Sequence, residues 1–295
     1  MGWKIRHCGA ATLYRMKIGV TGASGFIGGY VTRALVNAGH APVLLLRPSS
    51  VLPKEMESLN CVHHEIGDDP SGIYQALGSP DVLIHLAWGG LPNYKSLLHV
   101  TKELFIQFDF LRNMIEAGLP KLVVSGTCFE YGMQSGPLTE NTTVKPDNPY
   151  GFAKATLFSM LEILNRDKPF DLTWTRLFYL FGEGQAKSSL FSQIHRVATT
   201  GETIFPMSGG EQLRDFMPVE KFCEDFVSLA LTPGSHGAVN ICSGHPVSVR
   251  SLVEKWIADN NWNLSLKLGH YPYPDYEPMA FWGVRNKLDT ILENA

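Results

Sequence analysis

The chain has 295 residues, of which 44% are hydrophobic, and a formal net charge of −3 at pH 7. This length allows one large core or two joined lobes, and the near-neutral charge provides no basic surface for nucleic acid or for an acidic membrane. No stretch is apolar over the ~20 residues that a bilayer span requires. The five cysteines and ten histidines lack metal-site spacing. We therefore expect no metal, no disulfide framework and a reducing, cytoplasmic location.

Residues 1–15 precede the first predicted strand and show no regular spacing of apolar side chains. Their apolar run is short and is interrupted by Arg15, which does not suit the apolar core of a secretory signal peptide. We expect a disordered or spurious extension, with Met16 as the candidate start of the native protein.

The first predicted strand, 17–21, runs directly into a glycine-rich loop and then into an apolar helix that ends near Gly39. In such a loop one glycine permits a tight turn, one lets backbone N–H groups approach a pyrophosphate, and one lets the helix pack closely on the strand. Three glycines can be purely structural, but their position between a strand and a helix N-terminus favours dinucleotide binding. The cofactor-binding residues predicted here are Gly22, Ser24, Gly25, Phe26, Ile27 and Gly28.

The second predicted strand, 42–46, ends at Arg47, about 20 residues beyond the glycine loop. A carboxylate at this position would hydrogen-bond the adenosine ribose, whereas an arginine forms paired, charged hydrogen bonds to a 2′-phosphate. Ser49 and Ser50 lie close behind Arg47 in the chain. The sequence therefore predicts NADP as the cofactor, with NAD as the alternative, because a merely solvated surface arginine would look the same.

Further elements follow at regular intervals: strands at 61–66, 81–86 and 121–125, and a long helix at 100–117. Strands that alternate with helices indicate an α/β fold with a doubly wound parallel sheet of the Rossmann type, whose ligands bind beyond the carboxyl ends of the strands. Small or polar residues follow the third and fourth strands at those ends. From these we expect Asp68 to meet the adenine, and Leu86 and Ala87 to pass beneath the cofactor.

Tyr150 and Lys154 lie four residues apart in a segment with helical spacing. On a helix this places a phenol and an ammonium on one face, about 5–6 Å apart at Cβ, where the cation would stabilise a phenolate. Because a tyrosine ordinarily loses its proton near pH ~10, the pairing would let Tyr150 exchange a proton near neutral pH. Taken alone, the two residues could equally be a packing pair.

Several segments match one known family in order and spacing. They are 21–28, 85–87, 125–132, 150–154, 176–182, 214–216 and 240–244. The chain resembles the extended short-chain dehydrogenase/reductase family, which is also called the NAD-dependent epimerase/dehydratase family, in its nucleotide-sugar 4-ketoreductase branch. The resemblance covers nearly everything from Met16 onward. It implies a dinucleotide-binding domain at 16–177 and a smaller α/β lobe at 178–295, interleaved with the first, that binds the nucleotide sugar.

The resemblance also implies catalytic roles. Thr127 takes the place of the family's catalytic serine or threonine, Tyr150 that of its acid/base, and Lys154 that of the lysine that holds the nicotinamide ribose. Hydride transfer to a ketone builds negative charge on the carbonyl oxygen, so a hydroxyl and a proton donor are the groups that this chemistry needs.

Substrate contacts are implied on the same grounds. Arg214 matches an arginine that approaches the diphosphate, although a salt bridge with Asp215 or Glu211 would also explain it. Tyr179 stands where many relatives have an asparagine, and the aromatic tail 271–282 either closes over a deoxy sugar or packs against the core. The expected substrate-binding residues are Trp88, Thr127, Tyr150, Tyr179, Gln185, Ser189, Phe205 and Arg214.

Cys128 and Phe129 separate the candidate reactions within this family. The 4,6-dehydratases carry Asp-Glu after the threonine; here those carboxylates are absent, and Glu130, one place further along, is expected to point elsewhere. Reductases and epimerases share the triad, but 4-epimerases usually have an acidic residue at the position of Arg47. We therefore expect reduction of the 4-keto group of a nucleoside-diphosphate 4-keto-6-deoxy sugar. The alternatives are a nucleotide-sugar 4-epimerase and a non-catalytic NADP-binding regulator.

The family's frequent homodimer, built from two helices of each subunit, is a further implication of the resemblance. Apolar side chains at Leu104, Ile106, Phe108 and Phe110 are compatible with such an interface, and equally with a buried helix. Apart from the nucleotide-sugar substrate and a second copy of the chain, we expect no partner, and specifically no nucleic acid and no membrane.

Overall fold

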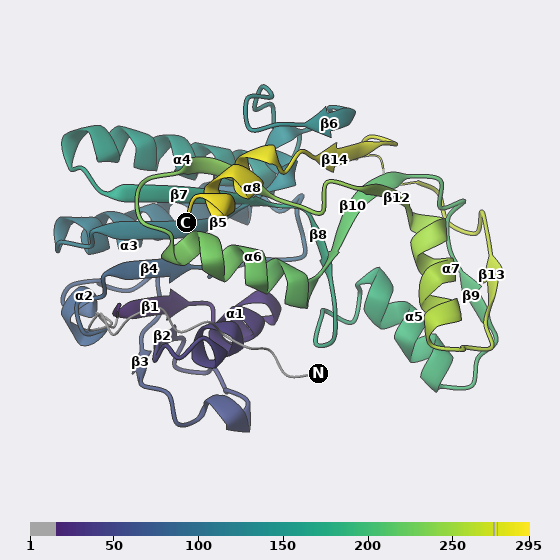
Figure 1. Ribbon diagram of the computed structural model, residues 1–295, viewed down its shortest axis with the longest axis horizontal. Coiled ribbons are helices and arrows are strands. Elements are labelled where there is room, and N and C mark those ends of the chain that lie inside the picture. The colour runs from purple at the N-terminus through teal and green to yellow at the C-terminus, as the bar shows by residue number, and fades with distance from the viewer. Residues whose placement is uncertain (1–15, 274, 276) are drawn as a thin grey trace.

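The computed structural model describes residues 16–273, 275 and 277–295, so the expected extension at 1–15 lies outside the described residues. A seven-stranded parallel sheet with the order β11-β7-β5-β4-β1-β2-β3 dominates the fold (Figure 1). The strand order reverses between β1 and β4, where an open α/β sheet forms its ligand crevice. The strands are β1 (Ile18–Thr21), β2 (Val43–Leu46), β3 (Cys61–His63), β4 (Val82–His85), β5 (Lys121–Thr127), β7 (Asp171–Leu177) and β11 (Gly237–Ile241).

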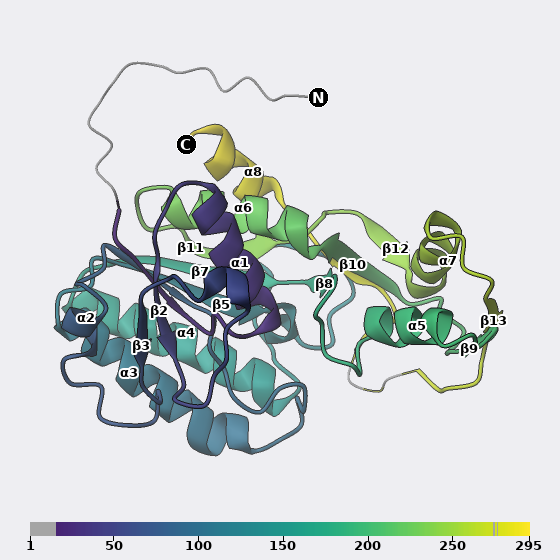
Figure 2. The same cartoon turned by 90° about the horizontal axis from the view of Figure 1, so that it is seen from below.

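Helices cover both faces of this sheet, as Figure 2 shows. One face carries α1, α6 and α8, and the other carries α3 and α4. In β2, Leu44 and Leu46 pack into the first core and Leu45 into the second. Because the strands are buried on both sides, they are nearly continuous apolar runs in the sequence. The helices are α1 (Phe26–Asn37), α2 (Ile73–Ala76), α3 (Leu104–Glu116), α4 (Pro149–Asp167), α6 (Val219–Leu231) and α8 (Asn286–Glu293), with a short 3₁₀ turn η1 (Lys54–Met56).

The predicted fold class is confirmed, but some elements differ in extent from the prediction. The strand predicted at 61–66 is shorter, because its neighbour β2 ends where β3 does. The strand predicted at 121–125 continues to Thr127, because β7 supplies pairing partners that far. The helix predicted at 100–117 begins as a π-helical turn, η2 (His99–Glu103), which continues directly into α3. Turns of this kind occur frequently at functional sites.

A smaller lobe extends from one end of the sheet, to the right in Figure 1. Its core packs α5 (Leu190–Thr199) against α7 (Val249–Asp259). After residue 178 the chain also returns to the large sheet, to which it contributes β11 and the covering helices α6 and α8. The short strands pair as β8 (Tyr179–Phe181) and β12 (Pro246–Ser248) on either side of β10 (Leu213–Pro218), β9 (Ile204–Pro206) with β13 (Ser265–Lys267), and β6 (Gly136–Leu138) with β14 (Phe281–Gly283).

Asp215 of β10 joins several of these segments. Its buried carboxylate accepts hydrogen bonds from the backbone N–H groups of Ser243 at 2.7 Å, Gly244 at 3.0 Å and Gly283 at 3.3 Å. Burial raises the pKa of Asp215, and the hydrogen bonds from Ser243, Gly244 and Gly283 oppose that rise. The carboxylate therefore satisfies backbone donors of two other chain segments that would otherwise be buried without partners.

Two searches of the structure were confined to the described part of the chain. No helix in it is long and apolar enough to cross a membrane. No group of three or more His, Cys, Asp or Glu side chains in it could hold a metal ion.

Candidate active site

The glycine loop after β1 forms a cradle at the carboxyl ends of β1 and β4. Gly22 has a φ of +75°, and a Cβ at this position would lie 2.7 Å from the backbone nitrogen of Ala87. A Cβ at Gly28 would lie 2.0 Å from the carbonyl oxygen of Gly22, so only glycine lets α1 begin this close to the strand. No side chain caps the N-terminus of α1, and no acidic residue lies in its first turn. Its N–H groups and dipole are thus suited to the pyrophosphate of a dinucleotide.

A cavity of about 410 Å³ adjoins this loop, which is a size typical of ligand pockets. Arg47, Ser50 and Ser24 are among the residues that line it, with the two serine hydroxyl oxygens 3.3 Å apart. A guanidinium beside hydroxyl groups is well suited to a phosphate. Of the residues predicted to bind the cofactor, those that line this cavity are Gly22, Ser24, Gly25, Arg47, Leu86 and Ala87.

Five residues predicted to bind the cofactor are not among those lining the cavity: Phe26, Ile27, Gly28, Asp68 and Lys154. Phe26 and Ile27 pack against the core on the α1 face of the sheet, and Gly28 acts through close helix–strand packing. Asp68 lies on an exposed loop beyond Ile66, and Ile66 itself lines the cavity. The rotation of α1 and the path of the loop therefore decide which of the predicted side chains line the cavity.

Local capping positions the start of α4, which carries two of the catalytic candidates. Asn148 accepts a hydrogen bond from the N–H of Gly151 at 2.9 Å, and Pro149 occupies the first helical position, where no N–H is needed. From this start, Tyr150 and Lys154 both face the interior. The predicted shared face of the helix is therefore present.

Thr127, Tyr150 and Lys154 lie together beside Trp88, which lines this cavity. Thr127 is the last residue of β5, and its hydroxyl hydrogen-bonds the phenol of Tyr150. The Nζ of Lys154 donates to the carbonyl of Ser125 at 2.7 Å and lies 4.1 Å from the centre of the Trp88 ring, which lines the cavity. A hydroxyl and the phenol–amine pair of α4, which are distant in sequence, thus meet beside the wall of this cavity.

The electrostatics of this group differ from the expectation of a phenolate near neutral pH. Burial raises the pKa of Tyr150, the nearby Tyr94 raises it further, and the hydrogen bond from Thr127 lowers it. Burial lowers the pKa of Lys154 to about 7, against the opposing charges of Glu130 and Glu103. Exclusion of water disfavours both charged forms and outweighs the attraction between them. Tyr150 therefore keeps its proton, which suits a proton donor.

Aromatic rings surround Tyr150. The centres of the Trp88, Tyr94, His99 and Phe129 rings lie 6.0, 5.5, 5.3 and 6.4 Å from that of Tyr150. The Nδ1 of His99 accepts a hydrogen bond from the indole of Trp88 at 3.1 Å, which fixes both rings. The sequence pointed to Trp88 alone, because aromatic residues in loops are too common to be a signal.

Glu103 and Gln107 line the cofactor cavity and were missed in the sequence. The carboxylate of Glu103 accepts hydrogen bonds from the N–H of Gly89 at 3.0 Å and from the amide of Gln107 at 3.2 Å. A signal did exist, because an acid and an amide four residues apart interrupt an otherwise apolar helix face. Nearby, the buried His85 pairs with the hydroxyl of Thr21 at 3.0 Å, and burial lowers the pKa of His85 to about 3.

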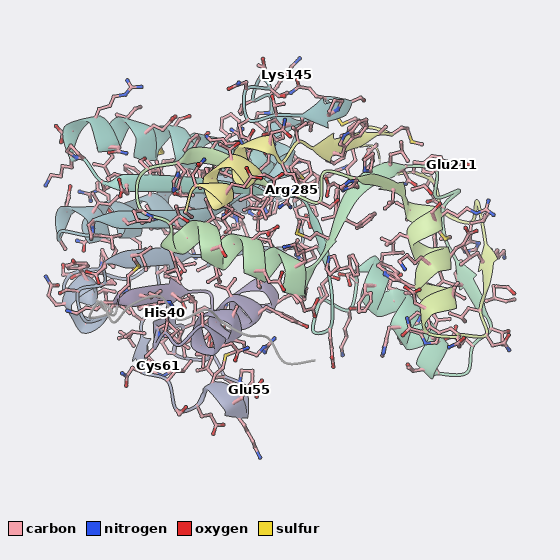
Figure 3. The ribbon with its side chains drawn as sticks, viewed as in Figure 1. His40, Glu55, Cys61, Lys145, Glu211 and Arg285 are labelled. Atoms are coloured by element: carbon pink, nitrogen blue, oxygen red, sulfur yellow. The ribbon has the colours of Figure 1, made fainter. Side chains whose placement is uncertain are left out.

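Arg214, expected to approach a diphosphate, is buried and held by the tail. Its Nε and Nη2 donate to the carboxylate of Glu277 at 3.2 and 2.9 Å. Its partner among the described residues is thus neither Asp215 nor Glu211, which lies elsewhere in the lobe (Figure 3). The Cζ of Arg214 lies 4.6 Å from the ring centre of Phe281, so this part of the tail packs against the lobe.

The remaining substrate candidates have structural contacts. Tyr179 is half-buried, with its ring 5.5 Å from that of Phe216, and burial raises the pKa of its phenol. Gln185 donates to the carbonyl of Leu180 at 2.7 Å, and Ser189 caps α5. Phe205 is 3% exposed and packs in the core of the lobe, and its contact with a nucleotide stays a prediction. Loop composition alone did not distinguish packing from binding.

Comparisons with known proteins agree with this geometry. The family model described as "NAD dependent epimerase/dehydratase family" matches residues 18–242. The chain is 30% identical to a dTDP-6-deoxy-L-talose 4-dehydrogenase (NAD(+)) of Aggregatibacter actinomycetemcomitans, over 92% of this chain and 100% of that protein. It is 27% identical to a GDP-6-deoxy-D-talose 4-dehydrogenase of the same organism, over 81% of this chain and 78% of that protein.

A solved structure shares the fold. It is a UDP-N-acetylglucosamine 4-epimerase from Methanobrevibacter ruminantium M1, with a TM-score of 0.82, 21% identity, and coverage of 94% of this chain and 91% of that one. The family inferred from the motifs is therefore confirmed. The chain belongs to the NAD-dependent epimerase/dehydratase family and is an enzyme of the extended short-chain dehydrogenase/reductase type.

Proposed function

We propose that this protein is a nucleotide-sugar 4-oxidoreductase that reduces the 4-keto group of a nucleoside-diphosphate 4-keto-6-deoxyhexose. The observation that carries the proposal is that the hydroxyl of Thr127 lies beside the phenol of Tyr150, next to Trp88 of the glycine-loop cavity. The two talose 4-dehydrogenases support it, because each is named for oxidation at C4, which is the reverse of the proposed reduction.

In this mechanism the hydroxyl of Thr127 hydrogen-bonds the C4 oxygen of the sugar, and Tyr150 donates its phenolic proton to that oxygen. The nicotinamide, when bound, supplies the hydride to C4. Tyr150 is left as a phenolate, which the ammonium of Lys154 stabilises until a proton returns. The aromatic rings around Tyr150 exclude water and so strengthen these interactions. In the oxidation direction the same groups act in reverse, with Tyr150 as the base.

The cofactor we propose is NADP, with NAD as the alternative that the family name and the dTDP-6-deoxy-L-talose relative favour. Arg47, Ser50 and Ser24 all line the cavity, and this group supports the presence of a 2′-phosphate. The glycine cradle itself fits either dinucleotide, because both carry the same pyrophosphate.

The direct test incubates the purified protein with dTDP- or GDP-4-keto-6-deoxyhexose and NADPH or NADH. We expect stoichiometric oxidation of the cofactor and formation of a 6-deoxyhexose product. Interconversion of two 4-epimers without net cofactor oxidation would instead identify an epimerase. Cofactor binding without turnover of any nucleotide sugar would identify the non-catalytic regulator and contradict the proposal.

We further propose that residues 178–295 supply the nucleotide-sugar side of the site and that residues 16–177 supply the dinucleotide side. Arg214 and Tyr179 support this division, because both lie in the later segment and β8 and β10 pair directly. The free thiols of Cys61, Cys128, Cys223 and Cys242 support a reducing, cytoplasmic location.

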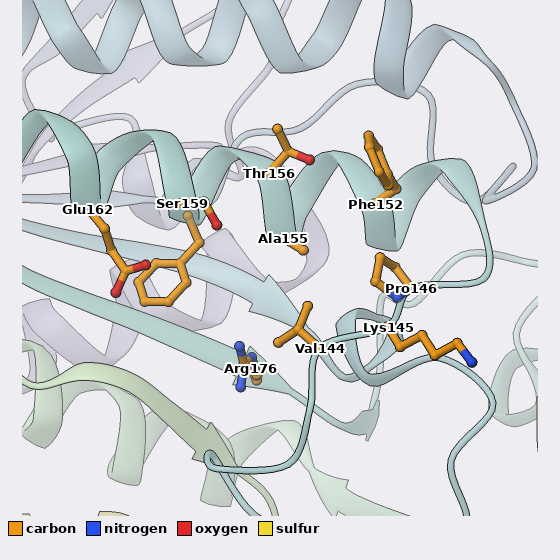
Figure 4. Close-up of a pocket in the computed structure, with 10 residues that line it drawn as sticks. Val144, Lys145, Pro146, Phe152, Ala155, Thr156, Ser159, Glu162 and Arg176 are labelled. Atoms are coloured by element: carbon orange, nitrogen blue, oxygen red, sulfur yellow. The ribbon is translucent and has the colours of Figure 1, made fainter.

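A homodimer through α3 and α4 is a further proposal, with different side chains from those expected. Leu104 and Phe110 are buried in the core and cannot form the contact. Phe105, Phe152 and Ile163 are 58%, 52% and 64% exposed instead. Figure 4 shows Phe152 on α4 beside an apolar hollow that Val144 and Pro146 also line. Light scattering should report a dimer, and Phe152→Glu with Ile163→Glu should yield a monomer. A monomeric wild type would contradict this proposal.

A further inference from the structure

Glu130 is a fully buried acid directly beneath the catalytic threonine. It ends the first turn of η3 (Cys128–Tyr131), a 3₁₀ helix that follows β5. Its Oε1 accepts from the backbone N–H of Thr127 at 2.8 Å and from the indole of Trp174 at 2.9 Å, and its Oε2 accepts from Nε of Arg176 at 2.7 Å. The side chain points into the protein interior, where it has a defined set of partners.

These contacts hold Thr127 from two directions. The hydroxyl oxygen of Thr127 accepts from the N–H of Phe129 at 3.3 Å, while Glu130 takes the N–H of Thr127 itself, so the pair forms a reciprocal capping box. Because the hydroxyl oxygen already accepts one hydrogen bond, its proton is directed outward, toward Tyr150. The orientation of the catalytic hydroxyl therefore depends on the turn that Glu130 closes.

The packing around the carboxylate leaves no room for adjustment. A Cβ at Gly126 would lie 2.2 Å from Nε1 of Trp174 and 2.5 Å from Oε1 of Glu130. Arg176 continues the network through Nη1, which donates to the hydroxyl of Tyr131 at 3.1 Å. Glu130 and Arg176 are 0% and 3% exposed, so the ion pair lies in a region of low dielectric. There the charge of Glu130 acts on its neighbours more strongly than it would at the surface.

We propose that Glu130 is a positioning residue of the active site, which orients Thr127 through its backbone and places a buried negative charge near Lys154. This inference rests on the proposed function only where it predicts a change in kcat. It concerns a position outside the catalytic triad, and it assigns a purpose to a buried acid that the hydride-transfer mechanism does not itself use.

The charged groups that face Lys154 come from three elements. Glu130 of η3 and Glu103 of η2 favour the ammonium, and the buried His85 of β4 lies close enough to be coupled to it. Of the two acids, Glu130 has the stronger effect on Lys154. Tyr150 is faced by Tyr94, Cys128 and Glu130, all of which disfavour its phenolate. Removal of the Glu130 charge should therefore lower the pKa of both Lys154 and Tyr150.

The test compares Glu130→Gln with a matched control, Asp225→Asn. Asp225 is also a buried acid, held by Arg285 at 3.0 Å and Lys221 at 2.9 Å on α6, and Arg285 lies at the start of α8 (Figure 3). We expect Glu130→Gln to lower kcat roughly 100-fold with a small change in KM, because the hydroxyl is misplaced. We expect Asp225→Asn to lower the melting temperature while it leaves kcat unchanged.

A second readout needs no substrate. Carbon-13 NMR of lysine-labelled protein, with Lys154→Met to assign the signal, should place the wild-type midpoint near pH 7. In Glu130→Gln the Lys154 midpoint should fall by about 1 pH unit. If the wild type turns over no sugar but the midpoint moves, the proposed function fails and the role of Glu130 stands. An unchanged midpoint together with an unchanged kcat overturns the inference.

Two further variants cover the case in which Glu130→Gln does not fold. Glu130→Gln combined with Arg176→Met removes both charges, so no unpaired charge remains in the interior. Trp174→Phe deletes a single hydrogen bond to the carboxylate. The double variant should lower both kcat and the Lys154 midpoint, as Glu130→Gln does. Trp174→Phe should lower kcat several-fold. Wild-type values in both would overturn the proposal.

Discussion

The two walls of the proposed active site, one on the sheet side and one on the lobe side, each hold a buried arginine against a glutamate, yet they are built in different ways. On the sheet side, Arg176 pairs with Glu130, whose other oxygen holds Thr127 only three residues away. On the lobe side, Arg214 pairs with Glu277, which is 63 residues distant along the chain. Glu130 therefore lies in the same turn as the residue that it holds, although Arg176 comes from β7, 46 residues away. The second pair exists only because the tail folds back.

The difference bears on what each wall can do. The sheet wall is locally braced, so its geometry should change little when ligands bind. The lobe wall depends on one long-range carboxylate, and a substrate diphosphate could compete with Glu277 for Arg214, because both are anions suited to a guanidinium fork. The catalytic groups stand on the rigid wall and the proposed binding groups on the adaptable one.

The largest effect should come from the rigid wall. Tyr150→Phe removes the proposed proton donor, and kcat should fall about 10²–10⁴-fold while cofactor affinity is retained. Cofactor oxidation measures turnover, and quenching of tryptophan fluorescence measures binding. Tyr74→Phe, which deletes a phenol that donates to the carbonyl of Gly118 far from the triad, is the control and should leave kcat unchanged. Wild-type turnover by Tyr150→Phe would contradict the role of Tyr150 as the proton donor.

Substitutions in the lobe wall should change KM for the nucleotide sugar. Arg214→Met should raise KM for the nucleotide sugar roughly 10–100-fold, which corresponds to the loss of hydrogen bonds to a charged group. Glu277→Gln should lower KM, because it frees the guanidinium. Arg250→Met, at an exposed pair with Glu254, is the control. If both buried-pair variants lower the melting temperature alone and leave KM unchanged, Arg214 and Glu277 form a structural pair and the comparison loses its functional meaning.

A smaller effect is expected at Arg47 in the cofactor cavity. Arg47→Asp should raise KM for NADPH about 10-fold or more through the loss of a charged hydrogen bond to the 2′-phosphate, and should spare NADH. Steady-state kinetics with both cofactors decide this. The exposed Arg166 on α4 provides a charge-matched control as Arg166→Asp. Equal losses for the two cofactors would argue for NAD and against the 2′-phosphate.

The smallest expected effect is a pH dependence of the free energy of unfolding, caused by the buried His85. The folded-state pKa of His85 is about 3, against an ordinary value of 6.5, so between these values the unfolded chain binds a proton that the folded chain does not. Stability should therefore fall as pH drops below 6.5, by roughly 2 kcal/mol between pH 6.5 and pH 5. Urea unfolding at several pH values measures the slope, which His85→Phe should reduce and the exposed control His63→Gln should not. An unaltered slope in His85→Phe would assign the acid sensitivity to other groups.

The sequence by itself determined the features that depend on local spacing. The glycine loop, Arg47 after the second strand, and the shared face of Tyr150 and Lys154 follow from residue order and from helix and strand periodicity. The parallel sheet follows from the alternation of strands and helices. These predictions agree with the structure because neighbours in the chain decide the conformation at each of these positions.

Only the tertiary structure decided the protonation states, the aromatic surroundings and the partners of the buried charges. Burial keeps Tyr150 protonated where its spacing from Lys154 suggested a phenolate. The tail takes Arg214 away from the partners that lie beside it in sequence, and the long pairing of β5 with β7 brings Arg176 beneath Glu130. Desolvation and long-range contacts depend on what surrounds a residue in space, and the order of residues along a chain does not specify that until the chain is folded.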